Sequence, residues 1–145
     1  MKNKSKLKKI KQMNAEKKAG MSQNKVPSQW LYMNATEVSF EQIKEMFAGS
    51  DKYSVQIWDE MGFLEIEIAE AKSIDIERTS PDLGDEYSNT FLQKNNVKTL
   101  WFVTISPEQY QLVKAVFSLI IENCGGFFCG DSEDFKPIVG NAVEV

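Results

Sequence analysis

The sequence predicts an α+β protein in which helices pack on one face of a largely antiparallel sheet. Three segments between residues 53 and 79 alternate apolar and polar side chains, which is typical of strands with one buried face. Residues 100–103 are apolar without interruption, which indicates a central strand buried on both faces. Two further segments, 40–47 and 107–123, repeat apolar residues at helical spacing.

The charge of the chain is divided unevenly between its start and the rest. Residues 1–25 contain nine lysines and one glutamate, a net charge of +8, whereas the other 120 residues hold 8 basic and 20 acidic side chains, a net charge of −12. The first segment has no aromatic residue and few apolar ones, so it cannot bury enough surface to offset the entropy of ordering. We therefore expect a disordered basic leader over residues 1–25 and a single acidic α+β domain over residues 26–145.

The first elements of the predicted domain are a strand and a helix. Residues 29–33 are rich in aromatic side chains and predict a short strand. Ser39 can cap the helix that follows, because a serine hydroxyl accepts hydrogen bonds from the free N–H groups of a first helical turn. Apolar residues then recur at helical spacing, and Gly49 ends the helix.

Three strands are predicted next, at 53–58, 63–69 and 73–79, and they form an antiparallel meander. We expect the second and third strands to pair in a hairpin centred near Ala71. This register places the isoleucines of both strands on the buried face and their carboxylates on the opposite face.

The second half of the domain begins with a loop and a short helix within residues 80–96, with Tyr87, Phe91 and Leu92 turned inward. The central strand follows within residues 97–105.

Ser106 opens the main core helix of the predicted fold. Pro107 suits its first position, and Gln109 completes a capping box with the serine. The helix runs to about Asn123, and the pair Gly125–Gly126 stops it.

The resulting order is β-α-β-β-β-α-β-α-β, and residues 136–145 are a candidate for one more strand. This order resembles a ferredoxin-like fold with an inserted strand and helix.

The two cysteines, Cys124 and Cys129, flank this glycine pair, and three carboxylates follow in residues 131–134. A structural zinc site needs four ligands, and the chain has no second cysteine pair and no histidine. The C-x-x-C spacing of redox pairs is absent, although a helix-end thiolate beside Lys136 stays open as an alternative. We expect the cysteines to be small apolar core residues and the acidic segment, which lacks EF-hand spacing, to be a solvated turn.

Several classes of chemistry are disfavoured by residues that the chain lacks. Without histidine, Ser-His-Asp and Cys-His catalysis are excluded in their usual forms. No glycine-rich phosphate loop is present. Arg78 is the single arginine, which counts against phosphoryl transfer and base readout, because both depend on bidentate arginine contacts.

The polar face of the predicted hairpin is the candidate functional site. The expected register puts Glu67 opposite Asp75 and Glu65 opposite Glu77, and like charges facing each other across strands destabilise a sheet by up to about 1 kcal/mol. Such charges can deter aggregation, dock a basic partner, or hold Mg²⁺, Mn²⁺ or Ca²⁺. The candidate partner-binding residues are Glu65, Glu67, Asp75, Glu77, Trp58 and Phe63.

We expect a small bacterial-type interaction protein without catalytic activity or cofactor, whose acidic face binds a basic protein. An immunity or antitoxin-like inhibitor that masks a cationic nuclease is one concrete form, by analogy of size, pattern and charge. The alternatives are a divalent-metal-dependent enzyme built on the same carboxylates or on residues 131–134, and RNA or ribosome binding through the leader. Nucleic-acid binding by the leader alone is expected to be nonspecific and sensitive to salt.

The sequence also indicates in which compartment of the cell the protein is expected. The apolar runs after the basic leader are too short for a secretory signal, and none approaches the roughly 18 residues of a membrane span. Two cysteines do not make a disulfide scaffold. We expect a cytoplasmic protein with reduced thiols and no membrane contact.

Overall fold

The structure, a computed structural model, describes residues 26–143. The predicted leader at residues 1–25 lies outside the described residues, as do residues 144–145. The strands are β1 (Gln29–Asn34), β2 (Tyr53–Trp58), β3 (Phe63–Ile68), β4 (Ile74–Thr79), β5 (Thr99–Thr104), β6 (Phe127–Gly130) and β7 (Ile138–Gly140). The helices are α2 (Phe40–Met46), α3 (Glu86–Lys94) and α4 (Tyr110–Cys124).

All seven strands form one open sheet in the order β2-β3-β4-β5-β1-β6-β7, and every neighbouring pair is antiparallel. The predicted α+β class and element order are confirmed, and β7 is the additional strand expected near the C-terminus. The apolar strand β5 holds the middle position, as its two-sided hydrophobicity predicts. The resemblance to a ferredoxin-like fold stays a prediction.

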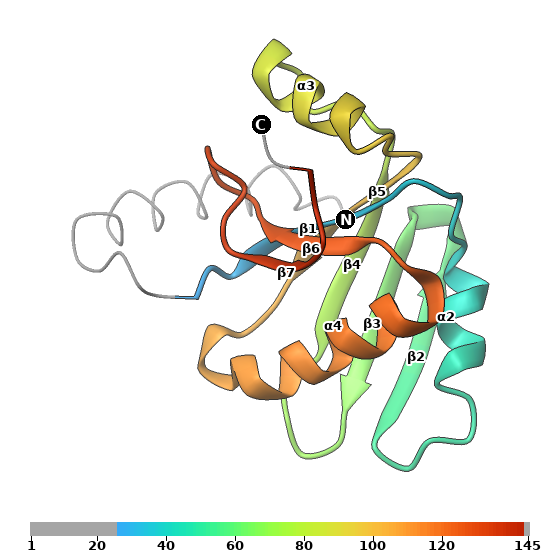
Figure 1. Ribbon diagram of the computed structural model, residues 1–145. Helices are drawn as coiled ribbons and strands as arrows, with labels where there is room; N and C mark the ends of the chain where they lie inside the picture. The colour runs from blue at the N-terminus through green and yellow to red at the C-terminus, as the bar shows by residue number, and fades with distance from the viewer. Residues whose placement is uncertain (1–25, 144–145) are drawn as a thin grey trace.

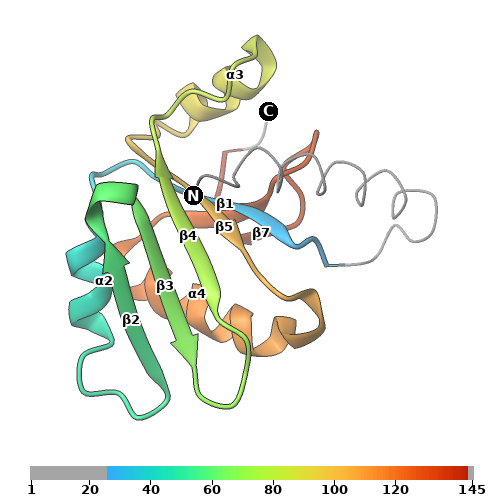
Figure 2. The same ribbon diagram turned by 180° about the vertical axis from the view of Figure 1, so that it is seen from behind.

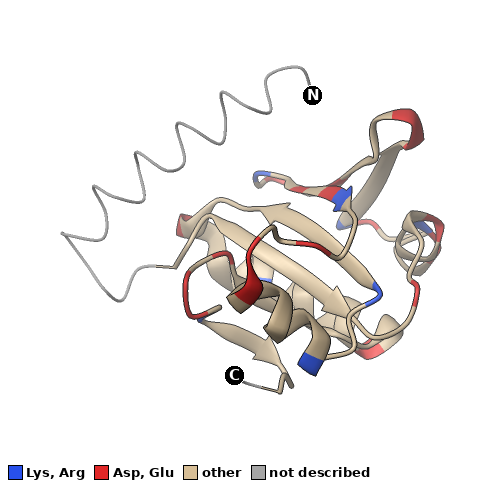
Figure 3. Ribbon diagram, turned by 90° about the horizontal axis from the view of Figure 1, so that it is seen from above, with Lys and Arg blue, Asp and Glu red and all other residues tan. Residues whose placement is uncertain are grey.

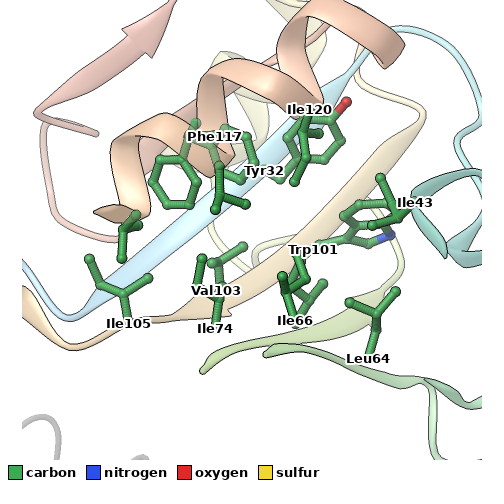
Figure 4. Packing of buried hydrophobic residues seen from close by; sticks show 14 of the residues in the cluster. Tyr32, Ile43, Leu64, Ile66, Ile74, Trp101, Val103, Ile105, Phe117 and Ile120 are labelled. Carbon is green, nitrogen blue, oxygen red and sulfur yellow. The ribbon is translucent and has the colours of Figure 1, made fainter. Parts of the chain in front are cut away.

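Helices α2 and α4 pack on one face of the sheet, which we call the inner face (Figure 1). Inward side chains of β1, β3, β4 and β5 meet the apolar sides of the helices there (Figure 4), and side chains of β2 and β6 join the same cluster. Aromatic rings fill the centre: Phe117 of α4 stacks on Phe128 at 3.8 Å between ring centroids, and Trp30 meets Phe117 edge-on at 5.3 Å. Burial of this cluster is the main stabilising contribution to the fold.

Helix α3 packs on the opposite, outer face, over β5, β1 and β6. The expectation that all helices lie on one face is therefore wrong for α3, because its apolar residues meet the outward side chains of these strands. Phe91 and Leu92 of α3 are buried there among residues such as Leu31, and Phe91 stacks on Phe135 at 4.3 Å between ring centroids. The predicted inward position of Tyr87 is wrong, because this side chain is 52% exposed. The outer cluster covers one half of the outer face and leaves the half formed by β2, β3 and β4 without a helix in front of it (Figure 2).

The predicted cap of α2 is confirmed. The Ser39 hydroxyl accepts a hydrogen bond from the Gln42 N–H at 3.2 Å, and the Gln42 side chain accepts one from the Ser39 N–H at 2.9 Å. This reciprocal arrangement satisfies two backbone donors that a helix start leaves free.

The predicted cap of α4 is wrong. The Ser106 side chain makes no capping bond, and Pro107–Gln109 forms a 3₁₀ turn before α4 begins at Tyr110. The Gln109 side chain instead accepts from the Lys72 N–H at 3.0 Å and donates to the Lys72 carbonyl. Gln109 therefore holds the β3–β4 loop by two hydrogen bonds to its backbone and does not form the predicted capping box.

The register of β3 against β4 differs from the prediction by two residues. Glu65 lies opposite Asp75 and Phe63 lies opposite Glu77, so the predicted pairs Glu67–Asp75 and Glu65–Glu77 are wrong. The strands are joined by a five-residue loop, 69–73, in which Glu70 has a positive φ of 60°. Because a shift by two residues preserves the side-chain alternation, each residue keeps its predicted face.

Candidate partner-binding face

The outer surface of β2, β3 and β4 carries the candidate site, which we call the acidic face (Figure 2). Its position follows from strand alternation, since Leu64, Ile66, Ile74 and Ile76 all point into the inner core. The intervening side chains therefore point outward. The acidic face consists of Ser54, Gln56 and Trp58 from β2, Phe63, Glu65 and Glu67 from β3, and Asp75 and Glu77 from β4.

The structure thus brings all six predicted site residues onto one surface. The described chain carries many acidic positions and few basic ones (Figure 3). The sequence found the carboxylates and the two aromatic residues from alternation alone. It did not identify their hydrogen-bond donors, because these depend on the strand register.

Two carboxylates of the acidic face are held by neutral donors. The Glu67 side chain accepts from the Ser54 hydroxyl at 2.9 Å and from the Gln56 amide at 3.2 Å. The Glu65 side chain accepts from the Ser73 hydroxyl at 2.8 Å, and the same hydroxyl lies 3.4 Å from Asp75 Oδ1. Hydroxyl and amide donors orient these carboxylates without contributing a positive charge.

Two basic side chains at the ends of these strands, Lys72 and Arg78, are paired with acids outside the acidic face. Lys72 pairs with Glu108 at 3.0 Å, and Arg78 pairs with Asp59 at 3.6 Å. Both pairs are well exposed to solvent, so each stabilises the fold by little.

The end of the acidic face next to the β2–β3 turn is aromatic. Trp58 is 40% exposed and lies opposite half-buried Phe63, with ring centroids 5.6 Å apart. Met61, in the 3₁₀ turn that follows β2, is 47% exposed. These side chains offer apolar contact area next to the carboxylates, and Met61 is a residue that the sequence analysis missed.

A cross-strand row joins this aromatic end to the outer cluster under α3. Glu77 lies between Phe63 on β3 and Phe102 on β5, and Phe102 lies opposite Leu31 on β1. Phe102 and Leu31 belong to the outer cluster. A partner on the acidic face would therefore meet carboxylates in the middle and apolar side chains along one border.

The two cysteines do not form a redox site. Cys124 packs against the inner cluster, whereas Cys129 is buried in the outer cluster, on the other side of the sheet. Burial raises the pKa of both thiols, and for Cys129 the nearby Asp131 raises the pKa further. The alternative of a helix-end thiolate beside Lys136 is disfavoured, because a reactive thiolate requires a lowered pKa.

The acidic segment 131–134 forms a turn fixed by its own side chains. The Ser132 hydroxyl donates to Asp134 at 3.0 Å, and the Lys136 N–H donates to the same carboxylate at 3.2 Å. Within residues 26–143, no group of three or more His, Cys, Asp or Glu side chains is placed to hold a metal ion.

A shallow hollow of about 470 Å³ lies beside α3. Among its lining residues, Asp82 is the one that titrates, and it accepts from the Asn89 amide at 3.0 Å and from the Gly84 N–H at 2.9 Å. These hydrogen bonds, that of Asn89 first, lower the pKa of Asp82. A single solvated carboxylate does not supply the acid–base pair that hydrolytic chemistry needs.

A buried polar network closes the C-terminal end of α4. The Tyr32 hydroxyl donates to the Gly125 carbonyl at 2.7 Å, and the Asn34 amide donates to the Tyr32 oxygen and to the Cys124 carbonyl, both at 2.8 Å. Desolvation raises the pKa of Tyr32 to about 12, so its phenol is neutral at physiological pH. The network satisfies helix carbonyls that would otherwise be buried without a donor, which is a structural role.

Comparisons with protein-family models, with curated proteins and with solved structures returned no match for this chain. None of the helices within residues 26–143 combines the length and the apolar character needed to cross a membrane. Functional inference therefore rests on the acidic face itself.

Proposed function

We propose that the protein is a non-catalytic binding module whose acidic face docks a basic protein. The observation that carries this proposal is the direct opposition of Glu65 and Asp75 on adjacent strands, with a neutral hydroxyl as their shared donor. Two carboxylates that face each other in this way favour a cationic group of a partner, which can lie against both at once.

The remaining features of the acidic face suit the same role. Glu67 and Glu77 extend the negative surface over two strands, which favours electrostatic steering of a basic protein. Trp58 supplies the large apolar contact that anchors many protein interfaces, and it already lies against Phe63. The partner is therefore expected to carry several lysines or arginines next to an apolar pocket.

One concrete form of this function is an immunity or antitoxin-like inhibitor in the bacterial cytoplasm, which masks a cationic nuclease with carboxylates. Size, fold class and charge support it at the level of analogy. In this form the acidic face competes with nucleic acid for the nuclease's basic surface, because phosphates and carboxylates recognise the same lysine and arginine side chains.

Affinity capture with matched charge variants tests the proposal. The baits are the full chain, the variant Glu65→Gln/Glu67→Gln/Asp75→Asn/Glu77→Gln, and a control in which Glu37, Glu45, Glu122 and Glu133 become Gln. The control positions are exposed and lie outside β2, β3 and β4, and both variants lose four negative charges. The captured protein is identified by mass spectrometry, purified and titrated calorimetrically at two salt concentrations.

We expect a basic protein that binds the full chain and the control equally, and the acidic-face variant at least about tenfold more weakly. Higher salt should weaken binding to the full chain more than binding to the acidic-face variant. Equal affinity for the full chain and the acidic-face variant would overturn the proposal, and so would equal weakening by both variants.

A further inference from the structure

The acidic face lies close to the point where the basic leader joins the domain. A single cross-strand row connects the first residue of β1 with the two facing carboxylates, through Gln29, Thr104, Asp75 and Glu65. The Thr104 hydroxyl donates to the Gln29 side chain at 3.3 Å, so both side chains share the outer face with the carboxylates. With about 4.8 Å between strands, the Cα atoms of Asp75 and Glu65 lie about 10 Å and about 14 Å from that of Gln29. Only residues 26–28 separate the leader from this row.

The leader is long enough to lie on the acidic face. Val26 packs against the inner cluster, so the leader has to pass the end of the strands to reach the outer face. Residues 19–25, AGMSQNK, contain a single charged residue and span at most about 25 Å when extended. That length exceeds the separation of Gln29 and Asp75, about 10 Å. Eight of the nine leader lysines precede this segment, so they lie within reach of the carboxylates.

The leader and the acidic face are complementary in charge and in apolar content. The leader has a net charge of +8, whereas the rest of the chain has a net charge of −12. The acidic face combines four carboxylates with the aromatic pair Trp58 and Phe63. Between its lysines the leader carries Leu7, Ile10 and Met13, which recur every three residues. The leader thus has the composition expected of a ligand for the acidic face, lysines beside apolar side chains.

Other surfaces near the leader are covered or already hydrogen-bonded. Helices α2 and α4 cover the inner face, and α3 covers the other half of the outer face (Figure 2). The turn 131–134 is a second group of carboxylates near β1, since the Asp131 N–H donates to the Gln29 carbonyl at 2.9 Å. Its Asp134 carboxylate already accepts two hydrogen bonds from neighbouring residues. Among residues 26–143, the acidic face is therefore the open sheet surface that best matches the leader.

We propose that residues 1–18 of the leader lie across the acidic face in the free protein and that a basic partner has to displace them. The contact itself needs no partner, whereas the displacement rests on the proposed function. A tethered segment has an effective concentration on the order of mM, which favours binding to its own domain. Exposed lysine–carboxylate pairs are individually weak, so several together hold the leader and a partner with an apolar pocket can replace it. The leader then lowers the apparent affinity for the partner in proportion to the fraction of faces it occupies.

Carbodiimide cross-linking of the full chain tests the contact, because this reagent joins a lysine amine to a carboxylate that touches it. An equal mixture of ¹⁴N- and ¹⁵N-labelled chains separates links within one copy from links between copies, and mass spectrometry maps the linked peptides. The Lys72–Glu108 pair, at 3.0 Å, is the internal reference.

We expect links within one copy from leader lysines to the four carboxylates of the acidic face, at least about tenfold more often than to four exposed control positions. The control positions are Glu37, Glu45, Glu122 and Glu133. An even spread over acidic-face and control positions would overturn the proposal. So would links mainly to the turn 131–134, or links mainly between copies.

A pair of charge variants shows whether the carboxylates hold the leader together. In Glu65→Gln/Asp75→Asn, leader links to the two remaining carboxylates, Glu67 and Glu77, should fall about threefold or more, because fewer charges hold the same segment. The control Glu37→Gln/Glu122→Gln should leave these links unchanged. Unchanged links in the first variant would overturn the proposal.

The displacement is tested with the basic protein identified by affinity capture. Replacing four leader lysines by glutamine should tighten partner binding about threefold or more, whereas replacing four exposed domain lysines should not, although both variants lose four positive charges. The leader positions are Lys8, Lys9, Lys17 and Lys18, and the domain positions are Lys44, Lys94, Lys98 and Lys114. Equal affinities for the two variants would overturn the displacement.

The two proposals fail in different ways. Leader links to the acidic face in a chain that captures no basic protein would overturn the proposed function, and with it the displacement, while supporting the contact. Capture of a basic protein through the acidic face, without leader links, would support the proposed function and overturn this inference.

Discussion

The carboxylates of Glu65 and Asp75 lie opposite each other on β3 and β4 and share one donor, the hydroxyl of Ser73. A serine hydroxyl has one proton, and the two distances, 2.8 Å to Glu65 and 3.4 Å to Asp75, show that it favours Glu65. Two like charges thus face each other across β3 and β4.

Glu65→Gln is expected to stabilise the protein. The substitution removes one of two facing charges while the amide oxygen can still accept from Ser73, so the free energy of unfolding should rise by about 0.3–1 kcal/mol. Urea unfolding measures this change, with Glu122→Gln on the exposed side of α4 as the control. The gain should shrink at about 1 M salt, and a destabilised variant would contradict the assigned repulsion.

Arg78→Ala is expected to loosen the turn beside the aromatic end of the acidic face. The guanidinium donates to the Asp59 carbonyl at 2.8 Å and lies 4.6 Å from the centre of the Phe40 ring. Loss of the hydrogen bond and of the cation–π contact should lower the free energy of unfolding by about 1–2 kcal/mol in urea titrations.

Two further variants separate the contributions of Arg78. Arg78→Lys should recover less than half of the loss, because an ammonium group cannot span the carbonyl and the ring as a planar guanidinium does. Asp59→Asn keeps the carbonyl acceptor and removes only the exposed ion pair, so it should cost less than about 0.5 kcal/mol. An equal loss for Asp59→Asn and Arg78→Ala would show that the ion pair is the dominant interaction instead.

Tyr32→Phe is expected to change how stability depends on alkaline pH. Burial raises the pKa of Tyr32 to about 12, above its ordinary value of 10.0. Between these two values the unfolded chain releases the phenolic proton while the folded protein retains it. The stabilising effect of the neutral phenol is therefore complete below pH 10 and is lost as the pH rises through about 12.

Urea titrations at about pH 8 and about pH 11 measure this effect. At the lower pH, Tyr32→Phe should cost about 1–3 kcal/mol, because the Gly125 carbonyl loses its donor. At the higher pH the gap between the unmodified protein and the variant should narrow. The exposed Tyr87→Phe is the control, and a gap that stays constant would contradict the buried neutral phenol.

The two cysteines are expected to differ in reactivity toward a soluble alkylating reagent. Cys124 is half-buried and Cys129 is buried, and burial raises the pKa of both thiols. Peptide mapping after brief labelling should show slow modification of Cys124 and modification of Cys129 only after unfolding. A disulfide between the two in the native protein would contradict their placement on opposite faces of the sheet.

Local patterns in the sequence were sufficient to predict the order of the elements and the two faces of the β2–β3–β4 meander. The uninterrupted apolar run in β5 identified the central strand, and Ser39 before a helical pattern of apolar residues identified the start of α2. Both signals depend on residues close together in the chain. The assignment of Glu65 and Glu67 to the outer surface was correct for the same reason, since alternation decides it.

The contacts that sequence reasoning missed join distant parts of the chain. The β3–β4 register depends on a loop that Gln109 holds from 37 residues away, and the same contact removes Gln109 from the predicted cap. The side of the sheet that α3 covers depends on Phe135, which lies far along the chain. The Ser73 donor of the candidate site was hidden by the same error in register.

The position of β1 also determines the order in which the chain can fold. Among the strands within residues 26–143, β1 is synthesised first, yet both of its neighbours, β5 and β6, come from the second half of the chain, with Gln29 paired to Thr104. The β2–β3–β4 meander can form from local contacts as soon as it leaves the ribosome, whereas long-range pairing of this kind slows folding. During translation the apolar residues of β1, Trp30 among them, have no sheet to join until β5, which ends at Thr104, is available. β1 therefore lies between two strands that are synthesised much later, β5 and β6. The sheet is complete only when the segment that contains β6 and β7 is present.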